Sequence, residues 1–159
     1  MRRILALVAS SGLFACAHSG GVPVQAPKFV NPTGLAPGRG YTHVVDVPAG
    51  RTIYVAGQVA FDEKGNLVGP GDVRAQTEQV FRNLRTALEG AGASLTDIVK
   101  LNWYVRDVSQ VAIFREVRDQ FLGSGPRPAS TLVEVKSLVR DDILIEVEAI
   151  AVPRSTTGG

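Results

Sequence analysis

Hydrophobic and polar residues alternate most regularly near the end of the chain, over residues 143–152 (ILIEVEAIAV). One face of this run is wholly apolar, and the other carries Glu146 and Glu148 between aliphatic side chains. A period of two is typical of a strand with one buried face. A second β-rich run, residues 130–135, precedes it across a polar turn at residues 140–142, so the pattern predicts a hairpin. Because buried carboxylates need partners, we expect chemistry, an interface or both on the mixed face.

Two stretches have the apolar spacing of helices instead. The first begins after Asp72, its predicted N-cap, and runs to about residue 89. Its inward face is expected to hold Val73, Thr77, Val80, Phe81, Leu84 and Leu88. The second helix follows Ser109 as its predicted cap, and the Gly-Ser-Gly-Pro sequence at residues 123–126 ends it.

Three further runs read as strands: residues 41–47, 52–59 and 98–106. The first two are separated by a Pro-Ala-Gly turn. The order β-β-α-β-α-β-β predicts an α+β domain in which two helices cover one face of a mixed β-sheet. Nothing in the chain is left to cover the other face, on which we place Leu132, Leu144 and Ile150. Because such an apolar exposed face is unusual in a monomer, we predict a homo-oligomer.

The first sixteen residues resemble a targeting segment. Arg2 and Arg3 precede an apolar run, residues 4–14, that is too short to span a bilayer. The sequence LFAC at residues 13–16 resembles a bacterial lipobox, which predicts a signal peptide at 1–16 and lipidation of Cys16. The protein would then be an exported lipoprotein facing the periplasm or cell surface, held on a membrane only through its lipid anchor. The alternative is an ordinary signal peptide and a soluble periplasmic protein.

Composition fits one small domain rather than two. The chain has 159 residues, and 45% of them are hydrophobic. Residues 17–40 are rich in Gly and Pro without a period, so we expect a flexible tether there. The domain is expected at residues 41–153, and residues 154–159 are expected to form a disordered tail.

Net charge and histidine content indicate which kinds of binding partner the chain is suited to. The chain has 17 Lys and Arg against 15 Asp and Glu, so loss of Arg2 and Arg3 would leave a formally neutral protein. A neutral chain without a basic run has no electrostatic footprint for nucleic acid. The two histidines, His18 and His43, lie far apart, and no phosphate-binding glycine loop is visible. We therefore expect no metal, no cofactor and no nucleic-acid partner.

Three segments together resemble the Rid family, the reactive-intermediate deaminases also called YjgF-type proteins. They are residues 53–58 (IYVAGQ), 97–107 (DIVKLNWYVRD) and 127–152, which ends EVEAIAV. The resemblance runs in order from about residue 40 to residue 152. It implies a chorismate-mutase-like fold that forms homotrimers with a barrel-like core, and ligand sites at the subunit interfaces. It also implies a cofactor-free hydrolysis of enamines or imines, formed from amino acids by pyridoxal enzymes, to 2-oxo acids and ammonia.

The resemblance also implies roles for individual residues. Glu146 matches the carboxylate that positions or activates water for attack on the imine carbon. Tyr41 and Gly57 match pocket positions, and Leu132 stands where the family frequently has a small residue or Cys. For the neighbouring carboxylates Glu134 and Glu148 we expect interface ion pairs instead.

The chain departs from the family at one important position. The family's deaminases carry an arginine directly after the Pro-Ala pair, where this chain has Ser130. An arginine fork binds a carboxylate bidentately, whereas a serine offers one neutral hydrogen bond. Arg115, on the second helix where the family often has Asn, and Arg127, at the strand entrance, are candidates to replace it. The alternative is that Arg115 is a solvated helix residue and Arg127 a rim charge.

Two functional hypotheses remain from the sequence. The first is a Rid-family protein that binds a small carbonyl or imine metabolite at the subunit interface and hydrolyses it, as a 2-iminobutanoate/2-iminopropanoate deaminase or a retuned variant. The second is a non-catalytic ligand-binding or scaffold trimer on the bacterial envelope. Cleavage of RNA, an activity sometimes ascribed to the family, is disfavoured by the neutral charge.

Overall fold

The computed structural model describes residues 25–33, 35 and 40–153 of the chain. The predicted signal peptide, the lipidation site Cys16 and the predicted tail at 154–159 lie outside these residues. Among the described residues, no helix is both long and apolar enough to cross a bilayer. The elements follow in the order β1 (Lys28–Val30), β2 (Val44–Asp46), β3 (Ile53–Gln58), α1 (Val73–Gly90), η1 (Leu95–Asp97), β4 (Ile98–Val105), η2 (Val108–Gln110), α2 (Val111–Leu122), β5 (Ala129–Glu134) and β6 (Ile145–Ala151).

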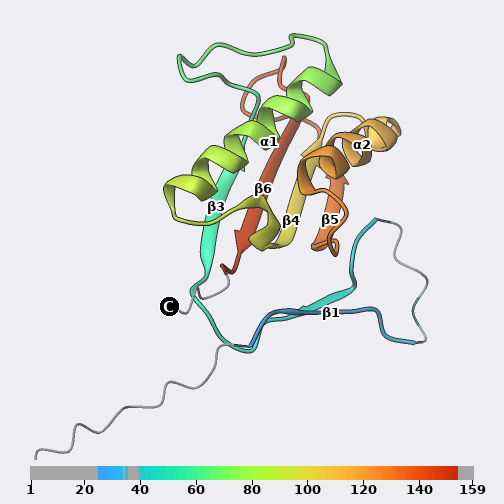
Figure 1. The fold of residues 1–159 in the computed structure, drawn as a ribbon. Helices are drawn as coiled ribbons and strands as arrows, with labels where there is room; N and C mark the ends of the chain where they lie inside the picture. The colour runs from blue at the N-terminus through green and yellow to red at the C-terminus, as the bar shows by residue number, and fades with distance from the viewer. Residues whose placement is uncertain (1–24, 34, 36–39, 154–159) are drawn as a thin grey trace, which may run out of the picture.

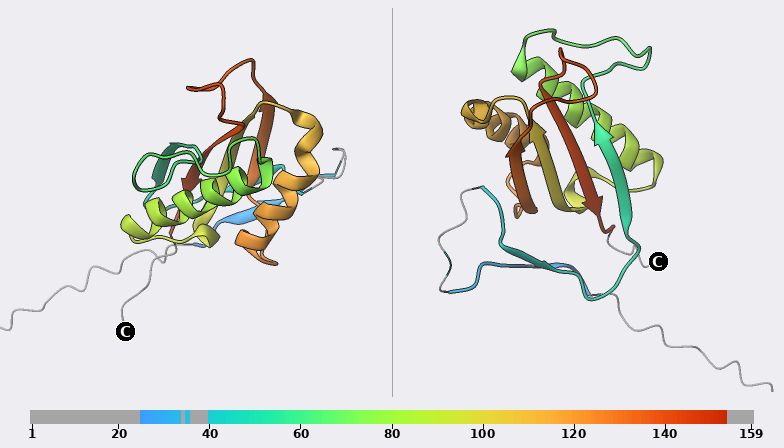
Figure 2. Two further views of the ribbon diagram at one scale, coloured as in Figure 1. Left: turned by 90° about the horizontal axis from the view of Figure 1, so that it is seen from above. Right: turned by 180° about the vertical axis from the view of Figure 1, so that it is seen from behind.

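Two layers make up the body of the molecule. Strands β3, β6, β4 and β5 form a four-stranded mixed sheet in that spatial order. Helices α1 and α2 lie side by side across one face of it (Figure 1). The view from behind shows the other face of the sheet without a helix on it (Figure 2). The predicted α+β class, with two helices on one face of a mixed sheet, is therefore confirmed.

The predicted hairpin between the last two strands is wrong. β5 pairs in parallel with β4, whereas β6 is antiparallel to both β4 and β3. Strand β4 therefore lies between β5 and β6, which do not pair. The reason is that β4, α2 and β5 form a helical crossover, which brings β5 back parallel to β4. The polar segment after β5 then leads into β6, which lies between β4 and β3.

The helix boundaries follow the sequence closely, with one exception at a cap. The Asp72 side chain accepts a hydrogen bond from Ala75 N at 3.0 Å, so this predicted N-cap of α1 is confirmed. The predicted cap Ser109 is wrong, because it lies inside η2. The Asp107 side chain caps that turn instead, accepting from Ser109 N at 2.9 Å.

The core lies between the sheet and the helices. Trp103 of β4 packs against Phe81 of α1 and Phe114 of α2, with ring centroids 5.5 Å and 6.4 Å away. The apolar face predicted for the last strand is buried here: Ile145, Val147, Ala149 and Ala151. The predicted inward face of α1 is also buried except for Val73, which is partly buried.

One predicted face assignment is wrong. In the parallel pairing Trp103 lies opposite Leu132, so both side chains are on the helix face of the sheet. Leu132 packs there against the core rather than on the uncovered face. Leu144 and Ile150 are half-buried, and Ile150 lies beside Tyr54, whose side chain is 77% exposed. The uncovered face therefore keeps apolar surface, and its burial by other subunits stays a prediction.

The segment predicted as a tether through residue 40 contains a strand. β1 pairs antiparallel with β2 in a separate two-stranded ribbon, which runs below one end of the main sheet (Figures 1 and 2). The strand predicted at residues 41–47 is shortened to β2 and belongs to this ribbon. A strand of three residues is too short to show a hydrophobic period, which is why β1 escapes a pattern search.

Candidate functional site

A cavity of about 350 Å³ opens between α2 and the outer strand β5. Four of the predicted ligand-binding residues line it: Tyr41, Arg115, Ser130 and Leu132. The remaining walls come from Gly40, Trp103, Val108, Val111, Phe114 and Arg118. Pockets that take small metabolites are commonly apolar with a few convergent polar groups, and this cavity has that character.

Contacts over a long sequence separation build one wall of the cavity. The Thr42 hydroxyl donates to the Arg127 carbonyl at 2.6 Å, and Thr42 N donates to the Pro128 carbonyl at 3.3 Å. The Arg118 guanidinium donates from Nη1 to the Gly40 carbonyl at 2.6 Å. These bonds hold Tyr41 beside the start of β5, although the two segments are more than eighty residues apart.

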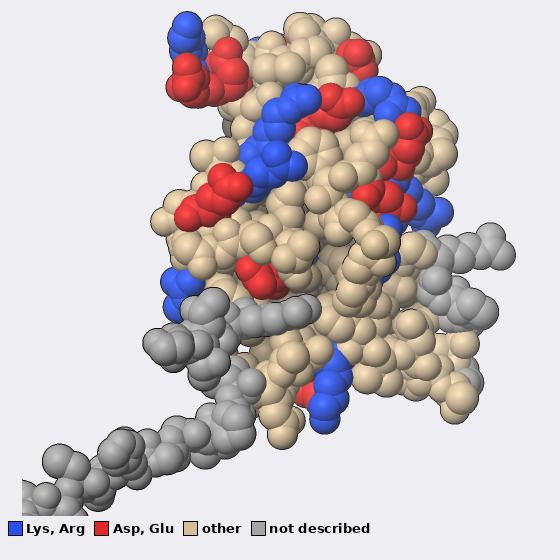
Figure 3. All heavy atoms as spheres, in the orientation of Figure 1, with Lys and Arg blue, Asp and Glu red and all other residues tan. Residues whose placement is uncertain are grey.

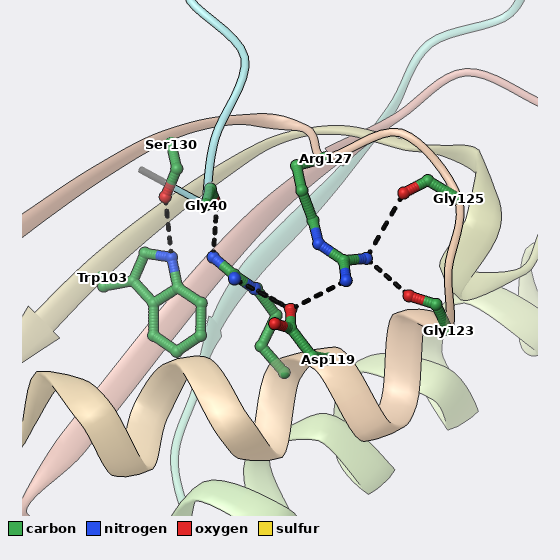
Figure 4. Close-up of polar contacts among 8 residues, drawn as sticks. Gly40, Trp103, Asp119, Gly123, Gly125, Arg127 and Ser130 are labelled. Carbon is green, nitrogen blue, oxygen red and sulfur yellow. Dashed lines mark hydrogen bonds and ion pairs between the residues drawn. The ribbon is translucent and has the colours of Figure 1, made fainter. Parts of the chain in front are cut away.

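Ser130 lies inside the cavity and is bonded to its aromatic wall. Its hydroxyl oxygen accepts a hydrogen bond from the Trp103 indole nitrogen at 3.1 Å (Figure 4). The parallel register brings Ser130 level with Leu101 on the helix face. The hydroxyl proton of Ser130 is therefore available to a ligand, but the side chain brings no charge.

The two arginines singled out in the sequence have different positions. Arg115 is exposed at the cavity and makes no hydrogen bond or ion pair with any described residue. Arg127 donates to the carbonyls of Gly123 and Gly125, at 2.6 Å and 3.4 Å, and pairs with Asp119 at 3.2 Å (Figure 4). It does not line the cavity, so of this pair only Arg115 faces the cavity.

Sequence reasoning missed a third arginine at the cavity. Arg118 is only 4% exposed, and its Nε and Nη2 each lie 2.8 Å from Asp119 Oδ1. Burial lowers the pKa of the Arg118 guanidinium, and the Asp119 carboxylate opposes that shift. The spacing held a signal, because Arg118 follows the buried Phe114 by four residues and so shares its helix face.

The predicted catalytic residue, Glu146, lies on the uncovered face of the sheet. A register shift between Val55 and Gln58 of β3 brings Gly57 beside it. A Cβ atom on Gly57 would lie 2.7 Å from the Glu146 carboxyl carbon and closer still to Oε1. Gly57 is therefore needed for steric reasons, because its missing side chain makes room for the carboxylate.

Glu146 differs from the neighbouring carboxylates in its bonding. Glu148 accepts hydrogen bonds from Asn102 and from the Tyr104 hydroxyl, both at 3.3 Å, and Glu134 accepts from Val108 N at 2.9 Å. Neither Glu134 nor Glu148 forms an ion pair with a described residue of the same chain, so the interface ion pairs expected for them stay a prediction. Glu146 makes no hydrogen bond or ion pair within the described chain, so its oxygens are available to water or a ligand.

The predicted site residues thus form two groups. Tyr41, Arg115, Ser130 and Leu132 lie together in the cavity on the helix face. Tyr104 of β4 lies opposite Glu146 and alternates with Trp103, so Glu146 is on the other face of the sheet. The sheet separates the groups, and one copy of the chain cannot bring both to one small ligand.

Metal-binding groups and surface charge indicate which kinds of ligand suit the described residues. No group of three His, Cys, Asp or Glu side chains among the described residues could hold a metal ion. On the helix side of the molecule, basic and acidic side chains are interleaved rather than gathered by sign (Figure 3). The surface on that side therefore lacks the single-sign patch that would attract a polyanion.

Comparison with known proteins gives consistent matches. The sequence model of the family described as Endoribonuclease L-PSP matches residues 32–153. A RutC family protein of Pyrococcus horikoshii is 37% identical over 127 residues, 80% of this chain and 91% of the relative. A 2-iminobutanoate/2-iminopropanoate deaminase of Dermatophagoides farinae is 31% identical over 80% of this chain and 98% of its own length.

A solved structure matches the fold as well. YyfB of Yersinia pestis, described as a protein of unknown function of the conserved Rid protein family, superimposes with a TM-score of 0.75. It is 35% identical, and the match covers 79% of this chain and 98% of that protein.

Proposed function

Because the chain belongs to the Rid family, whose sequence model is described as Endoribonuclease L-PSP, we propose that it binds a small imine or carbonyl metabolite and hydrolyses it. The Dermatophagoides relative, a 2-iminobutanoate/2-iminopropanoate deaminase, supplies the reaction class. The observation that carries the proposal is the state of Glu146, an unbonded carboxylate held against Gly57 at the edge of a water-accessible face.

Hydrolysis of an imine needs water and one proton carrier. In the proposed reaction, the Glu146 carboxylate takes a proton from water as the water oxygen bonds to the imine carbon. The protonated Glu146 then delivers that proton to the nitrogen of the resulting carbinolamine. The carbon–nitrogen bond of the protonated carbinolamine then breaks while the Glu146 carboxylate takes the hydroxyl proton, so a carbonyl compound and ammonia leave. Glu146 passes this proton, which entered with a protonated imine, to water. No redox cofactor is needed, because no atom changes oxidation state.

The separation of the two groups supports a site assembled between subunits. In this proposal, the uncovered face of one copy, with Glu146 and Gly57, meets the β5-edge cavity of the next copy. Tyr54 and Val139, 77% and 75% exposed, are apolar side chains that such contacts would bury. A cyclic trimer would repeat this head-to-tail contact three times and close it.

Ser130 sets the expected substrate range. A charge-assisted hydrogen bond contributes about 1.5–3 kcal/mol, so loss of a bidentate pair costs several powers of ten in affinity or rate. The enzyme therefore needs either a substrate without a carboxylate or a cation from another position.

The test is imine hydrolysis by the purified protein. Imines are generated in place by an amino-acid oxidase and trapped with semicarbazide, so that hydrolysis competes with trapping. The wild type, Glu146→Gln and Ser130→Arg are compared. We expect the wild type to accelerate imine loss and Glu146→Gln to abolish the acceleration.

The other outcomes are equally informative. Activity only in Ser130→Arg would show an intact pocket and a protein tuned to another ligand. Inactivity of both the wild type and Ser130→Arg would contradict the proposal and favour a binding or scaffold trimer. Full activity of Glu146→Gln would remove Glu146 from the mechanism.

A further inference from the structure

Two arginines share one carboxylate beside the β5-edge cavity, and a third arginine on α2 precedes them in the sequence. Arg118 and Arg127 both pair with Asp119, at 2.8 Å and 3.2 Å. Arg115, one turn before Arg118 on α2, is close enough to disfavour the charged form of the Arg118 guanidinium. Asp119 is thus shared by two arginines, and Arg115 has no ion pair with any described residue, so the cluster has an excess of positive charge.

The excess of positive charge matters because the Arg118 guanidinium is buried. A guanidinium that is removed from water needs compensating charge and hydrogen bonds. Arg118 donates to the Gly40 carbonyl and to Asp119 Oδ1, but these contacts do not use all of its N–H groups. Asp119 is itself shared with Arg127 and is 43% exposed, so water weakens its compensation. An anion in the cavity would complete the pairing of Arg118.

Gly40 keeps this guanidinium in contact with the cavity. Its φ of +81° is a conformation that glycine adopts readily and other residues rarely do. A Cβ at this position would lie 3.0 Å from Arg118 Nη2, so a larger residue would crowd the guanidinium. Gly40 therefore lines the cavity without covering the charge.

The rest of the cavity is suited to a short apolar group. Trp103, Phe114 and Leu132 supply aromatic and aliphatic walls, and the volume of about 350 Å³ is that of a small-metabolite site. Cationic groups of α2 thus share one cavity with apolar side chains of the sheet and of α2.

We propose that Arg118, assisted by Arg115, holds the carboxylate of a short apolar carboxylic acid in this cavity. Helix α2 then supplies the cation that Ser130 does not. The inference names a substrate class, carboxylate-bearing imines with short apolar side chains, and in this respect it rests on the proposed function. Carboxylate binding in the cavity does not depend on the proposed function.

Binding is tested with three small probes on the purified full chain. Butanoate carries the carboxylate alone, 2-butanone the carbonyl alone, and 2-oxobutanoate both. Trp103 is the only tryptophan of the chain and lines the cavity, so its fluorescence reports occupancy, with calorimetry as an independent readout. We expect butanoate and 2-oxobutanoate to bind, 2-butanone to bind at least tenfold more weakly, and added salt to weaken the first two.

Variants separate binding from structural support. Arg118→Lys keeps the charge but loses the fork, and should weaken butanoate at least tenfold. Arg115→Gln should weaken it several-fold. Asp119→Asn removes the competing carboxylate and should tighten it about threefold, which a purely structural pair would not do. Arg82→Gln, whose arginine pairs with Glu78 on α1, is the control and should leave affinity unchanged.

The outcomes decide between the inference and the proposed function. No butanoate binding by folded wild type, or unchanged affinity in folded Arg118→Lys, overturns the inference. If Arg118→Lys does not fold, Asp119→Asn and Arg115→Gln decide. Glu146→Gln should bind butanoate normally while losing imine hydrolysis. Binding without hydrolysis in the wild type would therefore contradict only the proposed function, and hydrolysis without butanoate binding only the inference.

Discussion

Glu146 and Gly57 lie so close across neighbouring strands that a side chain on Gly57 would overlap the carboxylate. The glycine is not required by its backbone angles, because its φ is not positive. It is required by space alone. The nearest Glu146 atoms belong to the end of a flexible side chain, so a substitution at Gly57 would move the carboxylate rather than break the sheet.

Gly57→Ala should therefore reduce imine hydrolysis by at least tenfold while changing the melting temperature little. The added methyl group displaces the Glu146 carboxylate. A displaced carboxylate lowers the rate of the reaction but leaves the stability of the fold unchanged. Gly90→Ala is the matched control, since a Cβ there meets nothing within 4 Å. The explanation fails if Gly57→Ala retains full activity or if Gly90→Ala loses it equally.

Gln76→Leu should destabilise the fold by about 3 kcal/mol or more, because it leaves buried backbone groups without partners. The Gln76 side chain is fully buried, accepts from Leu144 N at 2.8 Å and donates to the Asp142 carbonyl at 2.9 Å. It ties α1 to the entrance of β6. Urea unfolding measures the cost.

Gln120→Leu, at an exposed position of α2, is the control for Gln76→Leu and should change stability by less than about 0.5 kcal/mol. Equal stability of the two variants would mean that the Gln76 bonds contribute nothing net.

Tyr54→Glu should change the oligomeric state without unfolding the subunit. The Tyr54 side chain is 77% exposed in a single chain, so the substitution costs little there. In an oligomer that covers the sheet face, the new charge would be buried unpaired. Light scattering should give the mass of three chains for the wild type and a smaller mass for the variant. Ala112→Glu, on the exposed side of α2, should stay trimeric, and a wild-type mass of one chain would contradict the assembly.

Glu148→Gln should lower the pKa of the Tyr104 phenol toward its ordinary value. The Glu148 carboxylate, 3.3 Å from the Tyr104 hydroxyl, raises that pKa because its charge disfavours the phenolate. The neutral amide would remove this repulsion. Alkaline titration of phenolate absorbance measures the change, and the difference from Tyr104→Phe identifies this residue among the three tyrosines. An unchanged titration would mean that Glu148 does not act on Tyr104.

Local patterns identified the helices and most strands, because periodicity and caps depend on neighbours in the sequence. The alternation in β6 correctly placed its apolar face, and Asp72 correctly marked the start of α1. Pairing was beyond such patterns. The order β3-β6-β4-β5 depends on where the α2 crossover returns the chain, so an apparent hairpin became two separated strands.

For the candidate site, too, some features followed from the sequence and others only from the folded structure. The sequence by itself determined the fold class, through its hydrophobic periods, and the family, through motifs around Gly57 and Glu146. Only the tertiary structure decided that Leu132 faces the helices, that Arg118 rather than Arg127 reaches the cavity, and that the sheet separates Glu146 from Ser130. The physical reason is range: hydrophobic periods and caps act over a few residues, whereas charge and space at a site depend on segments that meet only after folding.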